Sequence, residues 1–260
     1  METEETKDGS LTPDVGEPKI QAPDSDFAIE EAIFAPAAQA RVKIRVFEVC
    51  FSVALVAYAI LAIAARVRAH FGWDVMLAER IQTIKLPGFE YLMIGLSWLG
   101  TGVAPFVLVA LTGAGLLAAK LRHEALVCVV GTGLGSALDS LLKLISNRPR
   151  PAPPLVHVIK HYQHQSFPSG HVFLFVEFFG FLFFLTYVLL KPIPLRRMLL
   201  VLLFLPVALI GLSRVYLGAH WPSDVAGGYL GGGLWLMLMM LAYTRLQESS
   251  ASKLLRGARG

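Results

Sequence analysis

The sequence predicts an all-α membrane protein, a bundle of six transmembrane helices that follows a disordered N-terminal tail. Of its 260 residues 55% are hydrophobic and only 16% are charged, and the mean hydropathy is +0.60. Soluble globular chains carry about 25% charged residues, so this composition indicates a membrane protein. Long apolar runs recur along the chain, without an internal repeat of roughly 20 to 50 residues.

The first 40 residues differ in kind from the rest. They hold ten acids against two lysines, whereas the remainder holds 21 Lys and Arg against nine acids. Rich in Pro, Gly and Ser, this segment cannot bury enough apolar surface to offset its ordering entropy. We expect residues 1–40 to form a disordered acidic tail, residues 41–247 the membrane domain and residues 248–260 a basic cytoplasmic tail. The tail lacks the pattern of a secretory signal, so the first span should be an anchor.

The six spans are predicted from runs that are long and poor in charge. A bilayer core of about 30 Å takes roughly 20 apolar residues as a helix. The runs cover residues 47–65, 91–119, 124–142, 171–190, 198–213 and 225–243. Between the first two, residues 70–88 mix polar and apolar side chains. This mixture suits either a helix lying at the membrane interface or an ordinary connecting loop with a short helix.

Basic residues near the spans set the expected orientation, because cytoplasmic loops are enriched in Lys and Arg. With six spans, the side that holds both termini carries twelve Lys and Arg, and the other side carries nine. We therefore expect the termini in the cytoplasm and the protein in the cell (inner) membrane. The loops after the third and fifth spans then lie together on the non-cytoplasmic face.

Those two loops hold nearly all of the unusual polar residues of the chain. Because both lie on one face of the membrane, their charged and hydroxyl side chains can meet. The residues are Lys143, Arg150, Ser169, Gly170, His171, Arg214, His220 and Asp224.

Three of these residues, Lys143, Arg150 and Arg214, are permanent cations. Guanidinium forks match tetrahedral oxyanions in bidentate fashion. Ser169 and Gly170 precede a predicted helix, where a hydroxyl, free backbone N–H groups and the helix dipole favour an anion. This set predicts a phosphate site.

Two histidines and a carboxylate add reactive groups to the phosphate site. His220 and Asp224 lie four residues apart, so on one helical turn the carboxylate can accept from one imidazole nitrogen and leave the other free to attack. His171 is placed to protonate the leaving alkoxide and later to activate water. Because no carboxylate cluster with metal spacing accompanies them, we expect no metal and no other cofactor.

In order and spacing these residues resemble the signature of the type 2 phosphatidic acid phosphatase and vanadium haloperoxidase superfamily. The resemblance covers roughly residues 90–245. The matching motifs are Lys143 with Arg150-Pro151 after six residues, then Pro168-Ser169-Gly170-His171, then Ser213-Arg214 with His220 after five and Asp224 after three more.

The resemblance implies a role for each of these positions. His220 would become phosphorylated with support from Asp224, and His171 would handle the leaving-group proton. The positions that would bind phosphate are Lys143, Arg150, Ser169, Gly170 and Arg214.

The function expected from these residues is metal-independent hydrolysis of a phosphomonoester or diphosphate of a lipid, through a phosphohistidine. Family substrates include phosphatidic acid, related lipid phosphates and polyprenyl (undecaprenyl) diphosphate, and the sequence does not choose among them. A haloperoxidase, a phosphotransferase and a non-enzymatic lipid-binding or transport protein are the alternatives. The expected partners are the membrane and the lipid substrate, with no nucleic acid, and the oligomeric state stays open.

Three further polar residues receive a minor role or none. Arg148 keeps the wrong spacing for the phosphate motif and is interpreted as an accessory. Asp139 lies one turn before Lys143 and can hold its ammonium group. Glu177 lies inside an apolar span, where an acid is a functional-site candidate by default, and it stays unassigned.

Overall fold

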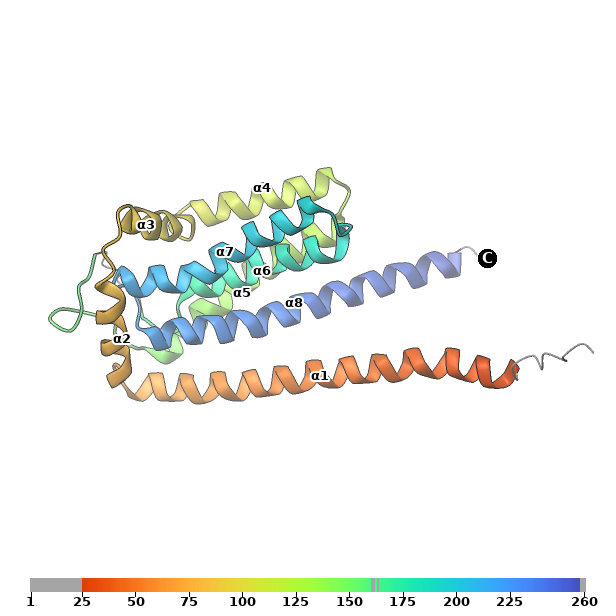
Figure 1. Cartoon of the computed structure of the whole chain (residues 1–260), viewed down its shortest axis with the longest axis horizontal. Helices are drawn as coiled ribbons and strands as arrows, with labels where there is room; N and C mark the ends of the chain where they lie inside the picture. The colour runs from red at the N-terminus through yellow and green to blue at the C-terminus, as the bar shows by residue number, and fades with distance from the viewer. Residues whose placement is uncertain (1–24, 160–161, 163, 258–260) are drawn as a thin grey trace, which may run out of the picture. The chain divides into compact units, whose positions relative to one another are not determined.

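The computed structural model describes residues 25–159, 162 and 164–257, with side chains from residue 45 to residue 249. Every regular element in these residues is a helix, eight in all (Figure 1). The chain divides into two units, residues 1–48 and 49–260, and the site lies in the second. Of the tail predicted at residues 1–40, the first 24 lie outside the described residues, and the backbone is helical from Ser25 onward.

Five predicted spans are confirmed as helices long and apolar enough to cross a membrane. Their apolar windows have mean hydropathies between 1.6 and 2.4. They are Arg45–Val67 within α1 (Ser25–Val67), α5 (Arg122–Ser146), α6 (Gly170–Leu189), α7 (Pro194–Tyr216) and Pro222–Ser249 within α8 (Pro222–Gly257).

The remaining predicted span, residues 91–119, is wrong as a single helix. Helix α3 (Phe89–Leu99) and helix α4 (Ala104–Ala118) are separated by a short break and bent by 64°, so that the pair can form one broken span. Gly102 in the break has a φ of +63°, which L side chains disfavour. A Cβ atom at Gly100 would lie 2.6 Å from His171 Cδ2. The break therefore brings backbone against one of the predicted site residues.

Residues 70–88 contain a helix, α2 (Gly72–Gln82), that lies across the ends of the neighbouring helices (Figure 1). Asp74 is fully buried, whereas Trp73 and Met76 on the same helix are about half exposed, at 44% and 51%. This crosswise placement and mixed surface favour the first of the two sequence interpretations, a helix at the membrane interface.

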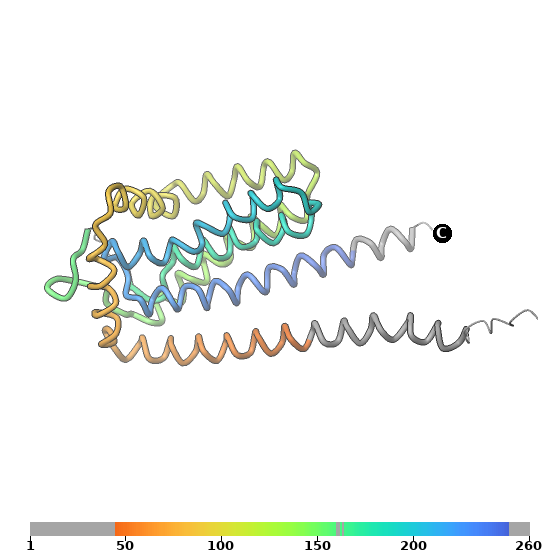
Figure 2. The backbone as a smooth tube through the Cα atoms, in the orientation of Figure 1, coloured from red at the N-terminus to blue at the C-terminus, as the bar shows by residue number. Residues whose placement is uncertain are grey.

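Helix α6 is the centre of the bundle and contacts α5, α7 and α8 (Figure 2). Its sequence is rich in phenylalanine, and Phe173 and Phe181 are at most 1% exposed. Glycines on α8 allow close approach, since a Cβ atom at Gly232 would lie 3.0 Å from the Phe173 carbonyl oxygen. Close van der Waals packing of this kind holds helices together where lipid removes the hydrophobic driving force.

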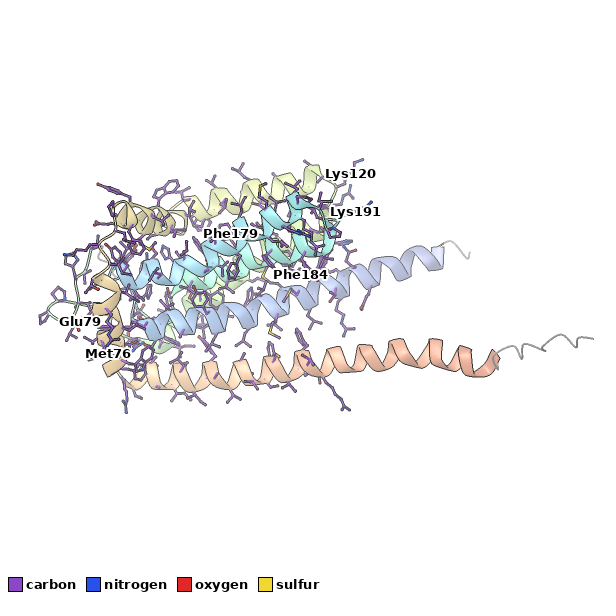
Figure 3. The ribbon with its side chains drawn as sticks, viewed as in Figure 1. Met76, Glu79, Lys120, Phe179, Phe184 and Lys191 are labelled. Carbon is purple, nitrogen blue, oxygen red and sulfur yellow. The ribbon has the colours of Figure 1, made fainter. Side chains whose placement is uncertain are left out.

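The bundle has two distinct ends. Lys120 and Lys191 lie in the α4–α5 and α6–α7 connections at one end, and Met76 and Glu79 of α2 lie at the other (Figure 3). The long connection between α5 and α6 and the start of α8 lie at the α2 end (Figure 1). The parity predicted from the sequence is therefore reproduced in the second unit.

Candidate active site

A cavity of about 460 Å³ lies at the α2 end of the bundle. Its walls come from the α3–α4 break, α4, α5, α6, the end of α7 and the α5–α6 and α7–α8 connections. The structure brings most of the predicted site residues to its walls. They are Lys143, Arg150, Gly170, His171, Arg214 and His220. Ser169 and Asp224 are completely buried beside the wall.

Helix ends position these side chains. Lys143 lies in the last turn of α5 and Arg214 in the last turn of α7, while Asp224 lies in the first turn of α8. Ser169 is the N-cap of α6, but its hydroxyl makes no capping hydrogen bond. The N-terminus of α6 therefore keeps unused donors beside the cavity, which is the arrangement that binds anions in many proteins.

The cations are fixed in different ways. Lys143 forms an ion pair with Asp139, as the sequence predicted. Arg150 donates from Nη1 to the Ala219 carbonyl at 2.7 Å, which holds its guanidinium beside the cavity. Arg214 is fully buried and donates from Nη1 to the Ser97 hydroxyl, while its Nε and Nη2 have no partner in the described residues. Burial, reinforced by Arg214, lowers the pKa of Arg150 to about 10, so Arg150 is still charged at neutral pH.

His220 is 2% exposed and lies beside Arg150, with 3.1 Å between its Nε2 and Arg150 Nη1. Burial, together with the nearby charges of Arg150, Arg214 and Lys143, holds the pKa of His220 well below its usual value of 6.5. The imidazole is therefore neutral at pH 7, the state that a nitrogen nucleophile requires.

The lowered pKa of His220 predicts how stability depends on pH. Below pH 6.5 the imidazole of His220 binds a proton in the unfolded state but not in the folded state. The free energy of unfolding is therefore highest above that pH and falls as the pH is lowered. We expect the wild type to lose up to about 1.4 kcal/mol per pH unit relative to His220→Asn below pH 6.5. Unfolding in detergent at a series of pH values measures this difference, and parallel curves for the two proteins would contradict it.

Asp224 is held by three donors. Its Oδ1 accepts from Arg148 Nη1 at 2.6 Å, and its Oδ2 accepts from the Trp221 N–H at 2.9 Å and from the Ser166 hydroxyl. The predicted hydrogen bond to His220 is not formed, because Asp224 Oδ2 lies 3.7 Å from His220 Nδ1. The two groups are nevertheless neighbours, and catalytic hydrogen bonds often shorten only when substrate binds.

The sequence suggested that Arg148 is an accessory of the phosphate motif, but the structure places it elsewhere. Its side chain is fully buried and does not line the cavity. Nη2 lies 2.9 Å from Asp74 Oδ2 and Nη1 lies 2.6 Å from Asp224 Oδ1, so Arg148 links α2 to α8. Ser223 completes the group by donating from its hydroxyl to Asp74 Oδ2 at 2.7 Å. We call Asp74, Arg148, Ser223 and Asp224 the buried ion cluster.

Sequence reasoning also missed the residues that hold His171. Its Nε2 lies 3.0 Å from the hydroxyl of Thr101 in the α3–α4 break and 3.1 Å from the carbonyl oxygen of Ser97 in the last turn of α3. Tyr162 lies between two site cations, with its ring centre 5.0 Å from the Arg150 guanidinium and 4.9 Å from that of Arg214. A serine, a threonine and a tyrosine carry no signal in the sequence, and only the fold reveals their position.

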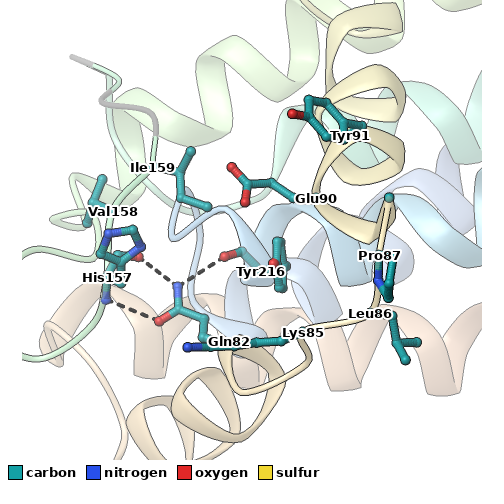
Figure 4. A pocket seen from close by; sticks show the side chains of 11 residues that line it. Gln82, Lys85, Leu86, Pro87, Glu90, Tyr91, His157, Val158, Ile159 and Tyr216 are labelled. Atoms are coloured by element: carbon teal, nitrogen blue, oxygen red, sulfur yellow. Dashed lines mark hydrogen bonds between the residues drawn. The ribbon is translucent and has the colours of Figure 1, made fainter.

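A second cavity, of about 890 Å³, contains none of the predicted site residues (Figure 4). Gln82 crosses its wall and donates from Nε2 to the carbonyl oxygens of His157 at 2.7 Å and Tyr216 at 3.1 Å (Figure 4). Gln82 therefore ties the end of α2 to the α5–α6 connection, which carries Arg150, and to the end of α7, which carries Arg214.

The fold and the site together define a class, a helical membrane protein in which three basic residues together with His171 and His220 line one cavity at one end of the bundle. Comparison with known proteins identifies the family. Residues 124–248 match the PAP2 superfamily. Phosphatidylglycerophosphatase B of Bacillus subtilis (strain 168) is 30% identical over 189 residues, which cover 71% of this chain and 88% of that protein. The chain belongs to the PAP2 superfamily.

Further relatives agree with this assignment. Decaprenylphosphoryl-5-phosphoribose phosphatase of Mycobacterium tuberculosis is 33% identical over 162 residues, 59% of this chain and 80% of that protein. The crystal structure of a transmembrane PAP2-type phosphatidylglycerolphosphate phosphatase from Bacillus subtilis matches with a TM-score of 0.62 and 26% identity, over 73% of this chain and 94% of that one. Aquifex aeolicus LpxE matches with a TM-score of 0.54 and 26% identity, over 65% and 96%.

The resemblance predicted from the three motifs is therefore confirmed. The chain is an integral membrane protein and a lipid phosphatase of the PAP2 type.

Proposed function

We propose that the cavity binds the terminal phosphate of a lipid and that His220 attacks its phosphorus atom. The observation that carries this proposal is a set of buried donors without partners in the described residues, Arg214 Nε and Nη2 and the Ser169 hydroxyl. A buried polar group without a hydrogen bond costs about 1 to 3 kcal/mol. A phosphate oxyanion accepts from all of these donors at once and removes that cost.

The proposed reaction has two displacements. In the first, His220 Nε2 forms a bond to phosphorus while the bond from phosphorus to the leaving oxygen breaks, and His171 protonates that oxygen. In the second, His171 takes a proton from water, whose oxygen attacks phosphorus and breaks the bond to His220. Inorganic phosphate leaves, and both histidines return to their first state.

The cations carry the charge that develops on the phosphoryl oxygens. Lys143, Arg150 and Arg214 line one cavity, and each can approach an equatorial oxygen of the transition state. Asp224 orients the imidazole of His220 from the Nδ1 side of the ring. We propose that these three cations take the place of a metal ion in the reaction.

The position of the site and the position of two connecting-loop lysines, at opposite ends of the bundle, support a site on the non-cytoplasmic face of the inner membrane. The site lies at the α2 end, and Lys120 and Lys191 lie at the opposite end, where cytoplasmic loops carry positive charge (Figure 3). In this arrangement residues 41–247 form the phosphatase domain, and residues 1–40 and 248–260 both lie on the cytoplasmic side.

The relatives narrow the class of substrate. One is named for phosphatidylglycerophosphate and another for a decaprenyl-linked phosphoribose. Both names describe a phosphomonoester on a lipid, which favours such a substrate here over a diphosphate.

The proposal predicts that the enzyme needs no metal and is inhibited by vanadate. Purified protein should release phosphate from phosphatidylglycerophosphate in the presence of EDTA, because protein cations supply the positive charge. Vanadate should inhibit, since it adopts the geometry of the phosphoryl transition state. Phosphatidic acid and undecaprenyl diphosphate complete the panel of substrates.

The controls separate the parts of this prediction. Loss of activity in EDTA that Mg²⁺ restores would overturn the metal-free mechanism. No release from any member of the panel would overturn the assignment of these lipids as substrates.

A further inference from the structure

Two buried carboxylate oxygens beside the cavity have no partner in the described residues, Asp139 Oδ1 and Glu177 Oε2. Both side chains line the cavity. Glu177 is 0% exposed and Asp139 is 9% exposed. A carboxyl group can accept a hydrogen bond whether or not it is ionised, in contrast to the donors that await the phosphate.

Glu177 lies deeper in the bundle than the phosphate-binding residues, because it follows His171 by six residues on α6, about 9 Å along a helix axis. Asp139 lies closer to those residues, since it precedes Lys143 by one turn of α5 and its Oδ2 is paired with Lys143 Nζ. The cavity therefore has donors at its outer end, Asp139 beside them and Glu177 farther along the bundle.

Protein groups satisfy only part of the Glu177 carboxyl group. Its Oε1 lies at 3.5 Å from the Ser136 hydroxyl, a marginal hydrogen bond. The indole of nearby Trp235 donates to the Gly131 carbonyl at 2.9 Å instead. A Cβ atom at Gly135 would lie 1.7 Å from Glu177 Oε2, so a glycine is required there to leave room for the acid. The bundle thus accommodates a carboxyl group in an apolar span, where an acid is costly and is therefore a candidate for a functional role.

A lipid phosphate entering this cavity places its groups in a fixed order. The phosphate lies at the outer end, the phosphorylated alcohol follows, and the hydrocarbon chains leave toward the bilayer. The acceptors therefore face the alcohol, and an acceptor pair without partners fits a hydrogen-bond donor on that alcohol.

We infer that Glu177 and Asp139 bind a free hydroxyl group on the alcohol that carries the phosphate. The substrate class is then a lipid phosphomonoester with a hydroxyl next to the ester, such as the terminal glycerol phosphate of phosphatidylglycerophosphate. Phosphatidic acid and polyprenyl diphosphates lack such a hydroxyl. The inference rests on the proposed function, because it assumes that the outer end of the cavity holds the phosphate.

The test uses two substrates that differ only in this hydroxyl. Phosphate release by the full-length protein in detergent micelles is measured with phosphatidylglycerophosphate and with its analogue in which hydrogen replaces the hydroxyl of the terminal glycerol. We expect kcat/KM of the wild type to be about tenfold or more higher for the hydroxylated lipid, since buried acceptors are left unpaired by the analogue. For Glu177→Leu we expect the ratio of the two values to fall to about one.

Two further variants keep the test independent of folding. Glu177→Gln retains an acceptor oxygen at nearly the same volume, and it should keep part of the preference. Glu124→Gln is the matched control, because Glu124 is another buried glutamate whose Oε1 is already hydrogen bonded to Tyr243 at 2.9 Å, outside the cavity. It should keep the wild-type ratio.

The outcomes distinguish the inference from the proposed function. Equal kcat/KM for the two lipids in the wild type would overturn the hydroxyl contact and leave the phosphatase mechanism intact. A preference that persists in Glu177→Leu would remove Glu177 from the contact. No phosphate release from either lipid would overturn the proposed substrate class, and the inference with it.

Discussion

His220→Ala is expected to lower kcat for phosphate release by at least about 10⁴-fold, because in the proposed mechanism this side chain supplies the atom that bonds to phosphorus. The phosphate cradle should survive the change, since its cations are held by other groups. Arg150 keeps its 2.7 Å hydrogen bond to the Ala219 carbonyl, and Lys143 keeps its ion pair with Asp139. Vanadate should therefore still bind the variant, although covalent chemistry is lost.

The measurement combines turnover with detection of the intermediate. Wild type mixed with labelled substrate and quenched in alkali should carry acid-labile phosphate on the protein, and His220→Ala should carry none. His157→Ala is the matched control, since His157 is an exposed histidine of the same α5–α6 connection. Its kcat should stay within about twofold of the wild type. A folded His220→Ala protein with more than about one per cent of wild-type kcat would contradict the nucleophile assignment.

The spans, and the meeting of most candidate site residues around one cavity, could be predicted from the sequence because both depend on local patterns. Span length is set by bilayer thickness, so apolar runs mark the helices directly. Lys143, Arg214 and Asp224 occupy the ends of helices that parity places on one face of the membrane, and the roles that the motif spacing suggests for them stay predictions. Both inferences require no knowledge of how the helices pack.

The α3–α4 break was not predicted, because the run from residue 91 to residue 119 carries no charged residue, although Gly100, Gly102 and Pro105 lie within it. Glycine is tolerated in membrane helices, where neighbouring groups satisfy the freed backbone. The reason for the break is instead tertiary. Gly100 gives space to the ring of His171, and the Thr101 hydroxyl contacts that ring at 3.0 Å.

Arg148 was underrated for a similar reason. Its partner Asp74 is 74 positions away in the chain, on a helix that the sequence left ambiguous between an interfacial helix and a loop. Neither residue belongs to the family motif. Only the packing of α2 across the bundle end shows that Arg148 neutralises two buried acids.

Arg148→Ala is expected to lower the free energy of unfolding by about 3 to 5 kcal/mol, because removing one partner of a buried ion pair leaves an uncompensated charge. Here two charges are left, on Asp74 and Asp224, and both carboxylates are fully buried. Activity should fall as well, since Asp224 loses the 2.6 Å contact that fixes its Oδ1. Unfolding in detergent and kcat measure the two effects separately.

A double variant distinguishes loss of charge balance from loss of packing. Asp74→Asn added to Arg148→Ala removes one of the two stranded charges, so it should restore part of the unfolding free energy and little of kcat, because Asp224 still lacks its donor. Arg68→Ala is the matched control, since Arg68 is an exposed arginine 6.0 Å from the ring centre of Phe71, whose ring Arg148 also faces. Its effect should stay within about 0.5 kcal/mol.

Equal losses in the Arg68 and Arg148 variants, or strictly additive effects of Asp74→Asn and Arg148→Ala, would show that the buried ion cluster does not act as a unit. If the cluster does act as a unit, α2 does more than cover the bundle end. Asp74, the only buried acid of α2, then determines through Arg148 where the carboxylate of Asp224 lies beside His220.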